Sequence, residues 1–165
     1  MIIALACLAL VAAVGAFSCE AGQTGNGPVR VKIGGETFSL ETALDEPSRV
    51  KGLSGREKVA PDGGMIFVFR EPARLSFWMY DCLTDIDAAF LDDAGRIVTI
   101  HEMKAEPPRR PEESEDDYRA RLKMYPSRFA SRFVIELAPG TFRRLRVMEG
   151  DLISLPLDDL KRRAR

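Results

Sequence analysis

Two acidic side chains stand inside apolar runs of this sequence, where an ionised group is costly to bury. Asp87 lies in the run Ile86–Leu91, and Glu136 lies in the run Ser131–Leu137. Buried carboxyl groups need a partner or a shifted pKa. Both residues are therefore candidates for a ligand-binding site, and together they could also serve as the acid and base of a hydrolase.

Two arginines could supply the partners of these carboxyl groups. Arg49 and Arg56 lie close together in the sequence, and a guanidinium group binds a carboxylate through two parallel hydrogen bonds. We therefore expect them to pair with Asp87 and Glu136. Such pairs could simply hold a short helix onto a sheet, or spare donors could form a site for an anion or a small polar molecule.

The single tryptophan suggests a pocket wall. On an alternating strand, Trp78 shares a face with Ser76 and Tyr80, and the acidic residue Asp81 follows directly. An aromatic ring beside hydroxyl groups suits a wall on which a ligand stacks. The alternative is a tryptophan that covers one end of the core.

Metal binding and nucleophilic catalysis find little support. The spacing of Asp81, Cys82, Asp85, Asp87 and His101 matches no known ligand pattern, so we expect neither a metal nor another cofactor. Cys82 and His101 could form a thiolate pair. The chain has no Gly-x-Ser-x-Gly motif, and we favour binding over catalysis.

The elements that position these residues are mostly strands. Alternation from Val29 to Ile33, followed by Gly34-Gly35, predicts a hairpin. Pro47–Lys51 fits a short helix that ends at Gly52. The remaining predicted strands are Met65–Phe69, Leu75–Tyr80, Ile86–Leu91, Arg96–His101, Ser131–Leu137 and Asp151–Leu155, with a turn and short helix over Gly140–Val147.

Residues 105–128 interrupt this pattern with prolines and a dense run of charges. Pro111 fits the start of a helix that carries Tyr118, Leu122 and Tyr125 on one face. One narrow apolar stripe can dock only weakly. We therefore expect a mobile cover beside Glu136.

About seven short strands with brief helices predict a mostly β fold with some α+β character. We expect a compact, antiparallel, β-barrel-like single domain over residues 29–158, with one helical insertion and a charged tail at 159–165 that frays. The 165 residues carry a net charge of -1 with both signs interspersed. This distribution argues against a nucleic-acid partner, and we expect a monomer.

The first 18 residues are apolar but short for a membrane span, which is typical of a secretory signal peptide. Gly15, Ala16 and Ser18 lead into Cys19 and a Gly-rich linker over residues 19–28, which resembles the lipobox of bacterial lipoproteins. In that class the cysteine is lipidated and anchors the protein to the membrane. The alternative is an ordinary signal peptide with Cys19 incidental. Both predict export to the cell envelope or periplasm, with Cys82 left without a disulfide partner.

A series of short motifs runs through the chain in a fixed order. They are RVKGLSGR (49–56), GMIFVF (64–69), FWM (77–79), Ile86-Asp87 with Phe90 and Gly95, IEL (135–137) and Gly150-Asp151. In this order, from Val29 to Leu155, the chain resembles the domain of unknown function 192 family. The resemblance implies a β-rich, barrel-like fold in a bacterial or archaeal protein, often exported, whose biochemical role is not established.

The chain departs from the family pattern in one loop. Asp81-Cys82 stands where the family usually has Asn-Thr, and Asp85 stands where it usually has Pro. The loop is therefore more acidic than the pattern, and a ligand shared by the family does not transfer directly to this chain.

We expect an exported domain that binds a small polar or anionic ligand, or an envelope partner, without catalysis of its own. The alternatives are a hydrolase that uses Asp87 and Glu136, and an inert structural lipoprotein of the envelope. The predicted ligand-binding residues are Arg49, Arg56, Trp78, Tyr80, Asp81, Asp87 and Glu136.

Overall fold

The computed structural model describes residues 27–165. The predicted signal peptide, Cys19 and most of the linker lie outside the described residues. Within that range, none of the helices has the length and apolar character needed to cross a membrane.

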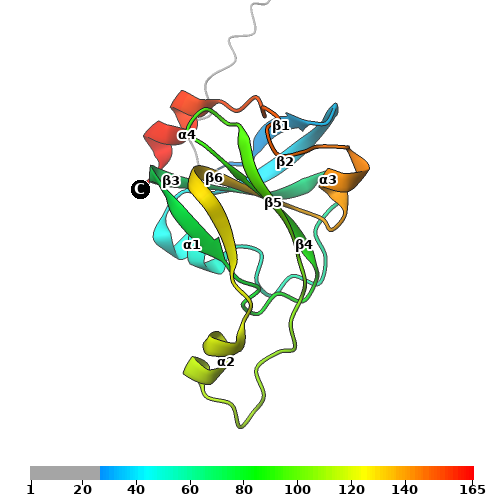
Figure 1. Cartoon of the computed structure of the whole chain (residues 1–165), viewed down its shortest axis with the longest axis vertical. Coiled ribbons are helices and arrows are strands. Elements are labelled where there is room, and N and C mark those ends of the chain that lie inside the picture. Colours follow the sequence, from blue (N-terminus) through cyan, green and yellow to red (C-terminus); the bar gives the residue numbers. More distant parts are fainter. Residues whose placement is uncertain (1–26) are drawn as a thin grey trace, which may run out of the picture.

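Six strands and four short helices follow one another along the chain (Figure 1). They are β1 (Val29–Ile33), β2 (Glu36–Ala43), α1 (Glu46–Lys51), β3 (Gly63–Phe77), β4 (Ile86–Leu91), β5 (Ile97–Met103), α2 (Glu115–Arg121), β6 (Tyr125–Leu137), α3 (Thr141–Arg144) and α4 (Leu157–Arg163). The predicted mostly β class is therefore confirmed.

The strands form one mixed sheet in the order β1-β2-β3-β6-β4-β5. Neighbouring strands are antiparallel except β2 and β3, which are parallel. Parallel neighbours need a crossover connection, and α1 with its following loop provides it. The sheet is open, so neither the closed barrel nor the fully antiparallel arrangement that we expected is present.

Strand β3 runs through a point where the sequence predicted a break. The predicted strands Met65–Phe69 and Leu75–Tyr80 join into one, with a register shift against β6 between Val68 and Ala73. Pro72 lies within this irregular part, where the ladder does not need the N–H group that proline lacks. The strand ends at Phe77, so Trp78 and Tyr80 belong to the loop that follows.

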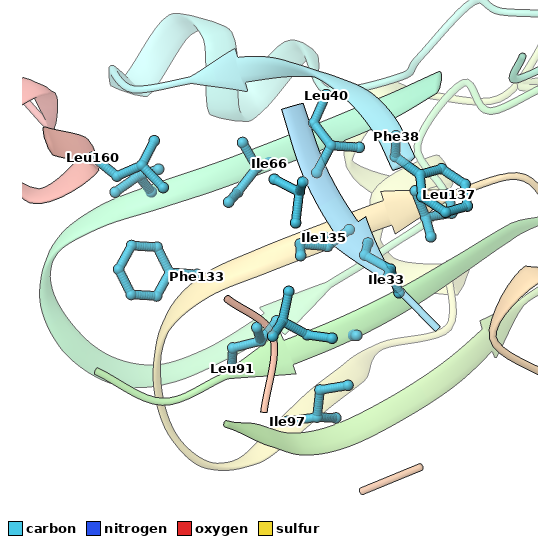
Figure 2. Packing of buried hydrophobic residues seen from close by; sticks show 14 of the residues in the cluster. Ile33, Phe38, Leu40, Ile66, Leu91, Ile97, Phe133, Ile135, Leu137 and Leu160 are labelled. Atoms are coloured by element: carbon cyan, nitrogen blue, oxygen red, sulfur yellow. The ribbon is translucent and has the colours of Figure 1, made fainter. Parts of the chain in front are cut away.

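Both faces of the sheet are covered, which explains why all six residues of β4 are buried. Along β4, Ala89 and Leu91 belong to one apolar cluster, and Ala88 and Phe90 to another on the opposite face. The first cluster is shown in Figure 2, with Ile66, Ile135 and Leu160 among others. We call the face of Ala88 and Phe90 the site face, because the candidate site lies on it.

Helix α1 has clear start and stop signals. The Asp45 side chain accepts a hydrogen bond from the Ser48 amide at 2.9 Å, and the Ser48 hydroxyl oxygen accepts one from the Asp45 amide at 3.2 Å. This reciprocal pair is a capping box. Gly52 ends the helix with φ 47°, in the left-handed range that glycine adopts readily.

The excursion between β5 and β6 extends beyond the sheet and carries α2 near its end (Figure 1). The helix begins after Ser114 rather than at Pro111, because the Ser114 hydroxyl accepts a hydrogen bond from the Asp117 amide at 3.1 Å. The predicted stripe is buried, with Tyr118, Leu122 and Tyr125 each below 5% exposure. Tyr125 already belongs to β6.

The C-terminal residues differ from expectation twice. Asp151–Leu155 forms no strand; instead Leu152 bridges to Arg96 beside β5, and Ser154 bridges to Lys32 in β1. The charged tail, which we expected to fray, forms α4, because Leu160 is fully buried in the first cluster.

Candidate functional site

Glu136 lies on the site face in the middle of the sheet. It sits opposite Met65 of β3 and opposite Ala88 of β4. The residue is only 5% exposed, and no hydrogen bond or ion pair joins its carboxyl group to any other described residue. Burial raises the pKa of Glu136 to about 8, and the charge of Arg56 opposes this shift only in part. The group is therefore mostly protonated at neutral pH.

A cavity of about 390 Å³ opens above this carboxyl group. One wall comes from α1 and the loop after it, another from β3 and the loop up to Cys82, and Met124 contributes from the excursion. Five aromatic side chains line it, namely Phe67, Phe69, Phe77, Trp78 and Tyr80. We call it the aromatic cavity.

The wall formed by α1 lies close to the sheet because Gly52 has no side chain. A Cβ atom at this position would lie 3.2 Å from the ring of Phe67. That ring packs edge-on against Phe77, with centroids 5.0 Å apart. The glycine therefore sets the depth of the cavity as well as the end of the helix.

Arg49 lines the aromatic cavity, but its partners are not the predicted ones. Its guanidinium group donates to the Val68 carbonyl at 3.0 Å, the Glu46 carboxylate at 3.2 Å and the Arg165 carbonyl at 3.0 Å. It also lies over the ring of Phe69 at 5.2 Å, which is a cation–π contact. Its buried Nε atom has no hydrogen-bond partner in the described part of the chain.

Arg56 lies outside the aromatic cavity and binds Glu41. Two parallel hydrogen bonds of 2.5 and 2.8 Å join the two side chains. The predicted pairing of Arg49 and Arg56 with Asp87 and Glu136 is therefore wrong. The sequence cannot show that Glu46, Glu41 and backbone carbonyls are nearer partners.

Asp87 lies on the opposite face of the sheet from Glu136. Asp87 pairs with Leu137, and the next residues along the two strands, Ala88 and Glu136, pair with each other. Because successive side chains of a strand point to opposite faces, Asp87 and Glu136 lie on different faces of the sheet. Its carboxylate accepts hydrogen bonds from the amides of Gly140 at 3.0 Å and Phe142 at 3.1 Å. Burial raises the pKa of Asp87, and these two N–H groups oppose the shift. Through these two hydrogen bonds, the Asp87 carboxylate fixes the loop that leads into α3.

The separation of the two carboxyl groups bears on the enzyme alternative. Asp87 borders a separate hollow with Glu102, Arg143 and Arg146, whereas Glu136 lines the aromatic cavity. An acid and a base must reach the same substrate from positions near its reacting bond. Two groups on opposite faces of a sheet do not meet this condition.

Trp78 and Tyr80 both line the aromatic cavity, as a pocket wall requires. Trp78 is 38% exposed at the mouth, and its ring centroid lies 5.9 Å from that of Tyr80. Tyr80 donates its hydroxyl hydrogen to Glu115 of α2 at 2.5 Å and contacts the ring of Tyr118 at 5.3 Å. The excursion is therefore attached directly to a cavity wall.

Asp81 has a role in the turn rather than in the cavity. Its side chain is exposed, its φ is 50°, and its amide donates to the Tyr118 hydroxyl at 3.0 Å. Asp85, the other acidic departure from the family pattern, binds Lys104 at 2.7 Å and the Ala105 amide at 2.9 Å. Both residues fix the loop and the base of the excursion.

Cys82 is a free, buried thiol in the lining of the aromatic cavity. Burial raises its pKa to about 12, and the nearby Glu136 adds to this effect. His101 points elsewhere: its Nε2 lies 2.8 Å from the Pro126 carbonyl oxygen, and its ring contacts Tyr125. The two residues do not form the thiolate pair considered above. Across residues 27–165, no group of three acidic, His or Cys side chains is placed to hold a metal ion.

Sequence reasoning missed part of the aromatic lining. The pattern Met65–Phe69 predicts only a strand, yet Phe67 and Phe69 both line the cavity. Their alternation with Val68, which packs in the first cluster, was the signal that could have placed them on the other face. Met124 gave no comparable signal, because its position depends on how the excursion returns to the sheet.

Comparison with known proteins agrees on the fold. The model of the DUF192 family, described as an uncharacterized ACR, matches residues 29–155. A crystal structure from Sinorhizobium meliloti 1021, described as that of a "putative transcription regulator", is similar at 32% identity and a TM-score of 0.61, covering 78% of this chain and 95% of that one. A protein of unknown function from Novosphingobium aromaticivorans is similar in fold at 24% identity and a TM-score of 0.62, covering 78% and 84%. A comparison with curated proteins found no match.

Proposed function

Because the chain belongs to the DUF192 family, for which no activity is described, we propose a function from the site itself: the domain binds a small organic ligand in the aromatic cavity and does not transform it. The ligand has an apolar body and a polar group. The aromatic walls would cover the body, and Glu136 would contact the polar group.

One observation carries this proposal: Glu136 is only 5% exposed, lines a cavity, and has no hydrogen bond or ion pair with another described residue. The carboxyl oxygens are not completely enclosed, since Arg49 Nε is the only buried side-chain N or O atom of the described residues that lacks a hydrogen-bond partner, so a molecule in the cavity could reach them. A carboxyl group in such apolar surroundings is unfavourable without a partner. Such a cost is common at functional sites, where a ligand supplies the missing partner. The predicted binding residues Arg49, Trp78 and Tyr80 line the same cavity, which strengthens the assignment.

Binding is favoured over catalysis because neither of the reactive groups considered from the sequence is placed or ionised to assist Glu136. Asp87 is on the other face of the sheet, and the Cys82 thiol, with a pKa of about 12, is not a nucleophile at neutral pH. A lone protonated carboxyl group is suited to hold a ligand.

We further propose that binding takes place in the cell envelope, with lipidated Cys19 as a membrane anchor and the chain as a monomer. The apolar segment 1–18, the small residues before Cys19 and the Gly-rich linker support this location.

A thermal-shift screen of small envelope metabolites tests the binding proposal. A true ligand raises the melting temperature of the wild type, and Trp78→Ala reduces that shift because it removes one wall of the mouth. The matched control is Phe129→Ala, since Phe129 is also an exposed aromatic residue, at 60%, but does not line the cavity. If the ligand-induced rise in melting temperature is reduced equally in Trp78→Ala and Phe129→Ala, or in neither variant, the ligand binds outside the aromatic cavity.

A further inference from the structure

We propose that the ligand of the aromatic cavity carries a protonated amine, which pairs with the Glu136 carboxylate and lies against the aromatic walls. This inference rests on the proposed binding function and goes further by naming the chemical class of the ligand. It departs from the expectation of an anionic ligand, which depended on arginine donors that the structure places in other contacts.

The first reason is that Glu136 has no counter-charge of its own. Arg56, the arginine whose charge acts on Glu136, is held by two hydrogen bonds to Glu41. A ligand ammonium group brings a positive charge and up to three N–H donors to a carboxylate that has none. The ionised carboxylate would repel a ligand anion at the same place.

The second reason is the number of aromatic rings around the carboxyl group. Ring faces attract cations, and desolvated contacts of this kind are the strongest. The chain already uses its cavity rings in this way: Arg49 lies over Phe69 at 5.2 Å, and Arg119 lies over Tyr80 at 5.5 Å. Phe67, Phe77 and Trp78 have no such cation among the described residues.

The positive charges of the lining lie away from Glu136. The Arg49 guanidinium group donates to the carbonyl of Val68. Val68 is three residues along β3 from Met65, the residue opposite Glu136. At about 3.3 Å per residue, these two backbone positions are roughly 10 Å apart along the strand. Arg49 is also paired with Glu46, and Lys51 is exposed at the mouth, where solvent screens it.

This arrangement predicts a definite direction for the effect of pH. Besides Glu136, the ionisable groups that line the cavity are Glu46, Arg49, Lys51, Tyr80 and Cys82, and Arg56 acts from outside. Of these, Glu136 is the group whose pKa is raised into the neutral range, to about 8. An ammonium ligand binds the ionised form, so its affinity should rise about tenfold per pH unit until that pKa and then level off. A ligand that accepts a hydrogen bond from the protonated form would show the opposite slope.

Matched probes test the inference by isothermal titration calorimetry. Phenethylamine and 4-phenylbutylamine carry the charge, 2-phenylethanol has a neutral hydroxyl group, and 3-phenylpropionate is an anion. At about pH 8.5 we expect at least one amine to bind ten times or more tightly than the alcohol. At about pH 6.5 the same amine should bind more weakly and release one proton, which titrations in two buffers of different ionisation enthalpy would detect.

Glu136→Gln separates charge from shape, because the amide is nearly isosteric with the carboxyl group. It should reduce amine binding to the level of the alcohol and remove the pH dependence. The matched control Glu71→Gln changes an exposed residue on β3 outside the cavity and should change neither. If Glu136→Gln fails to fold, proton release on amine binding to the wild type tests the inference without the variant.

Two results would overturn the inference. One is that 2-phenylethanol or 3-phenylpropionate binds as tightly as both amines. If Trp78→Ala then abolishes this binding, the aromatic cavity is a ligand site, but its ligand is not an amine. The other is that neither amine binds at about pH 8.5. The broader binding function is then decided separately by the metabolite screen.

Discussion

At the residue scale, the position of Glu136 lowers the stability of the fold but suits ligand binding. Its carboxyl group lies opposite Met65 and Ala88, which offer no polar atom from their side chains. The folded protein therefore holds it protonated at pH values where the unfolded chain releases the proton. Residues that are kept in unfavourable surroundings in this way are common at binding sites.

The first prediction concerns the pH dependence of folding. Because burial raises the pKa of Glu136 from 4.5 to about 8, the folded state binds one proton more than the unfolded state between these values. Stability should therefore fall as the pH rises through this window and level off above it. Denaturant titrations of wild type and Glu136→Gln would show the difference: at about pH 7.5 the variant should be more stable, by on the order of 3 kcal/mol. Equal stability at both ends of the window would mean that the group is hydrated or paired.

The second prediction concerns Cys82. A buried thiol whose pKa is raised to about 12 is almost entirely protonated at neutral pH and shielded from reagents. Iodoacetamide should leave it unmodified in the folded protein and modify it fully in denaturant, as measured by peptide mass spectrometry. Rapid modification in the folded protein would show that the thiol is open to solvent through the cavity.

At the element scale, the excursion between β5 and β6 is held by a few specific contacts. Arg121 donates to Glu113 at 2.6 Å and to the carbonyl groups of Pro107 and Pro108, so the excursion is tied together internally. At its tip, the excursion is attached to the loop after β3 through Tyr118, which contacts Tyr80 and accepts from the Asp81 amide, and through the hydrogen bond between Glu115 and Tyr80. A segment attached through a few side-chain contacts can open without unfolding the sheet.

The third prediction follows from that attachment. Amides of residues 112–123 should exchange with deuterium much faster than those of Ile66–Phe69 in the central sheet. Tyr118→Ala should increase exchange in the excursion further and weaken ligand binding, because it frees the Tyr80 wall. Arg128→Ala is a suitable control, since that exposed side chain lies after the excursion and makes only a 3.8 Å ion pair with Glu149. Equal protection of the excursion and the sheet would show that α2 is an integral layer.

Elements with local signals could be predicted from the sequence, and those that depend on distant partners could not. The hairpin over Gly34-Gly35, the helix that ends at Gly52 and the strand Ile86–Leu91 all occur. The path of β3 through Pro72 was missed because the bulge beside β6 tolerates proline, which no local pattern reveals. Helix α4 was missed because its single buried residue, Leu160, packs against strands far away in the sequence.

The candidate site follows the same division. The burial of Glu136 could be anticipated from the alternation of neighbouring residues. Trp78 does line the cavity, but the alternation that suggested it does not exist, because the strand ends at Phe77. The partners of Arg49 and Arg56 could not, because several acidic groups compete for each arginine and only the fold decides which is near. The sequence also gave no sign that Asp87 and Glu136 fall on opposite faces, since the register between β4 and β6 is a tertiary property.

At the scale of the whole molecule, one sheet separates two regions with different tasks. The first cluster, on the face away from the site, includes residues from β1, β2, α3 and α4. The site face contains the aromatic cavity, which keeps it from being packed completely. Stability should therefore depend mainly on the first cluster, and ligand binding on the site face.

The fourth prediction tests this division. Leu160→Ala removes a fully buried side chain of α4 from the first cluster and should lower the free energy of unfolding by about 2 to 5 kcal/mol. Leu152→Ala is the matched control, because Leu152 is 61% exposed, and it should change stability by less than about 0.5 kcal/mol. Binding of a ligand to the folded fraction should be the same in both variants. A small effect of Leu160→Ala would mean that α4 is only loosely docked.

The fifth prediction concerns the proposed anchor. If Cys19 is lipidated, the full-length protein should fractionate with membranes in its native host, and Cys19→Ala should release it or leave the signal uncut. Cys82→Ala is the control cysteine variant and should leave fractionation unchanged. Wild-type protein found wholly in the soluble fraction would contradict the anchor.

The two bridges made by the segment after Gly150 affect how the protein behaves in concentrated solution. An open sheet has two outer strands whose free N–H and C=O groups can pair with another molecule, which leads to aggregation. Leu152 and Ser154 each pair with one end of this sheet, beside β5 and on β1, so one short segment occupies part of both. We therefore expect the residues that the sequence predicted as a last strand to hinder strand pairing between molecules, in addition to the burial of Ile153 in the first cluster.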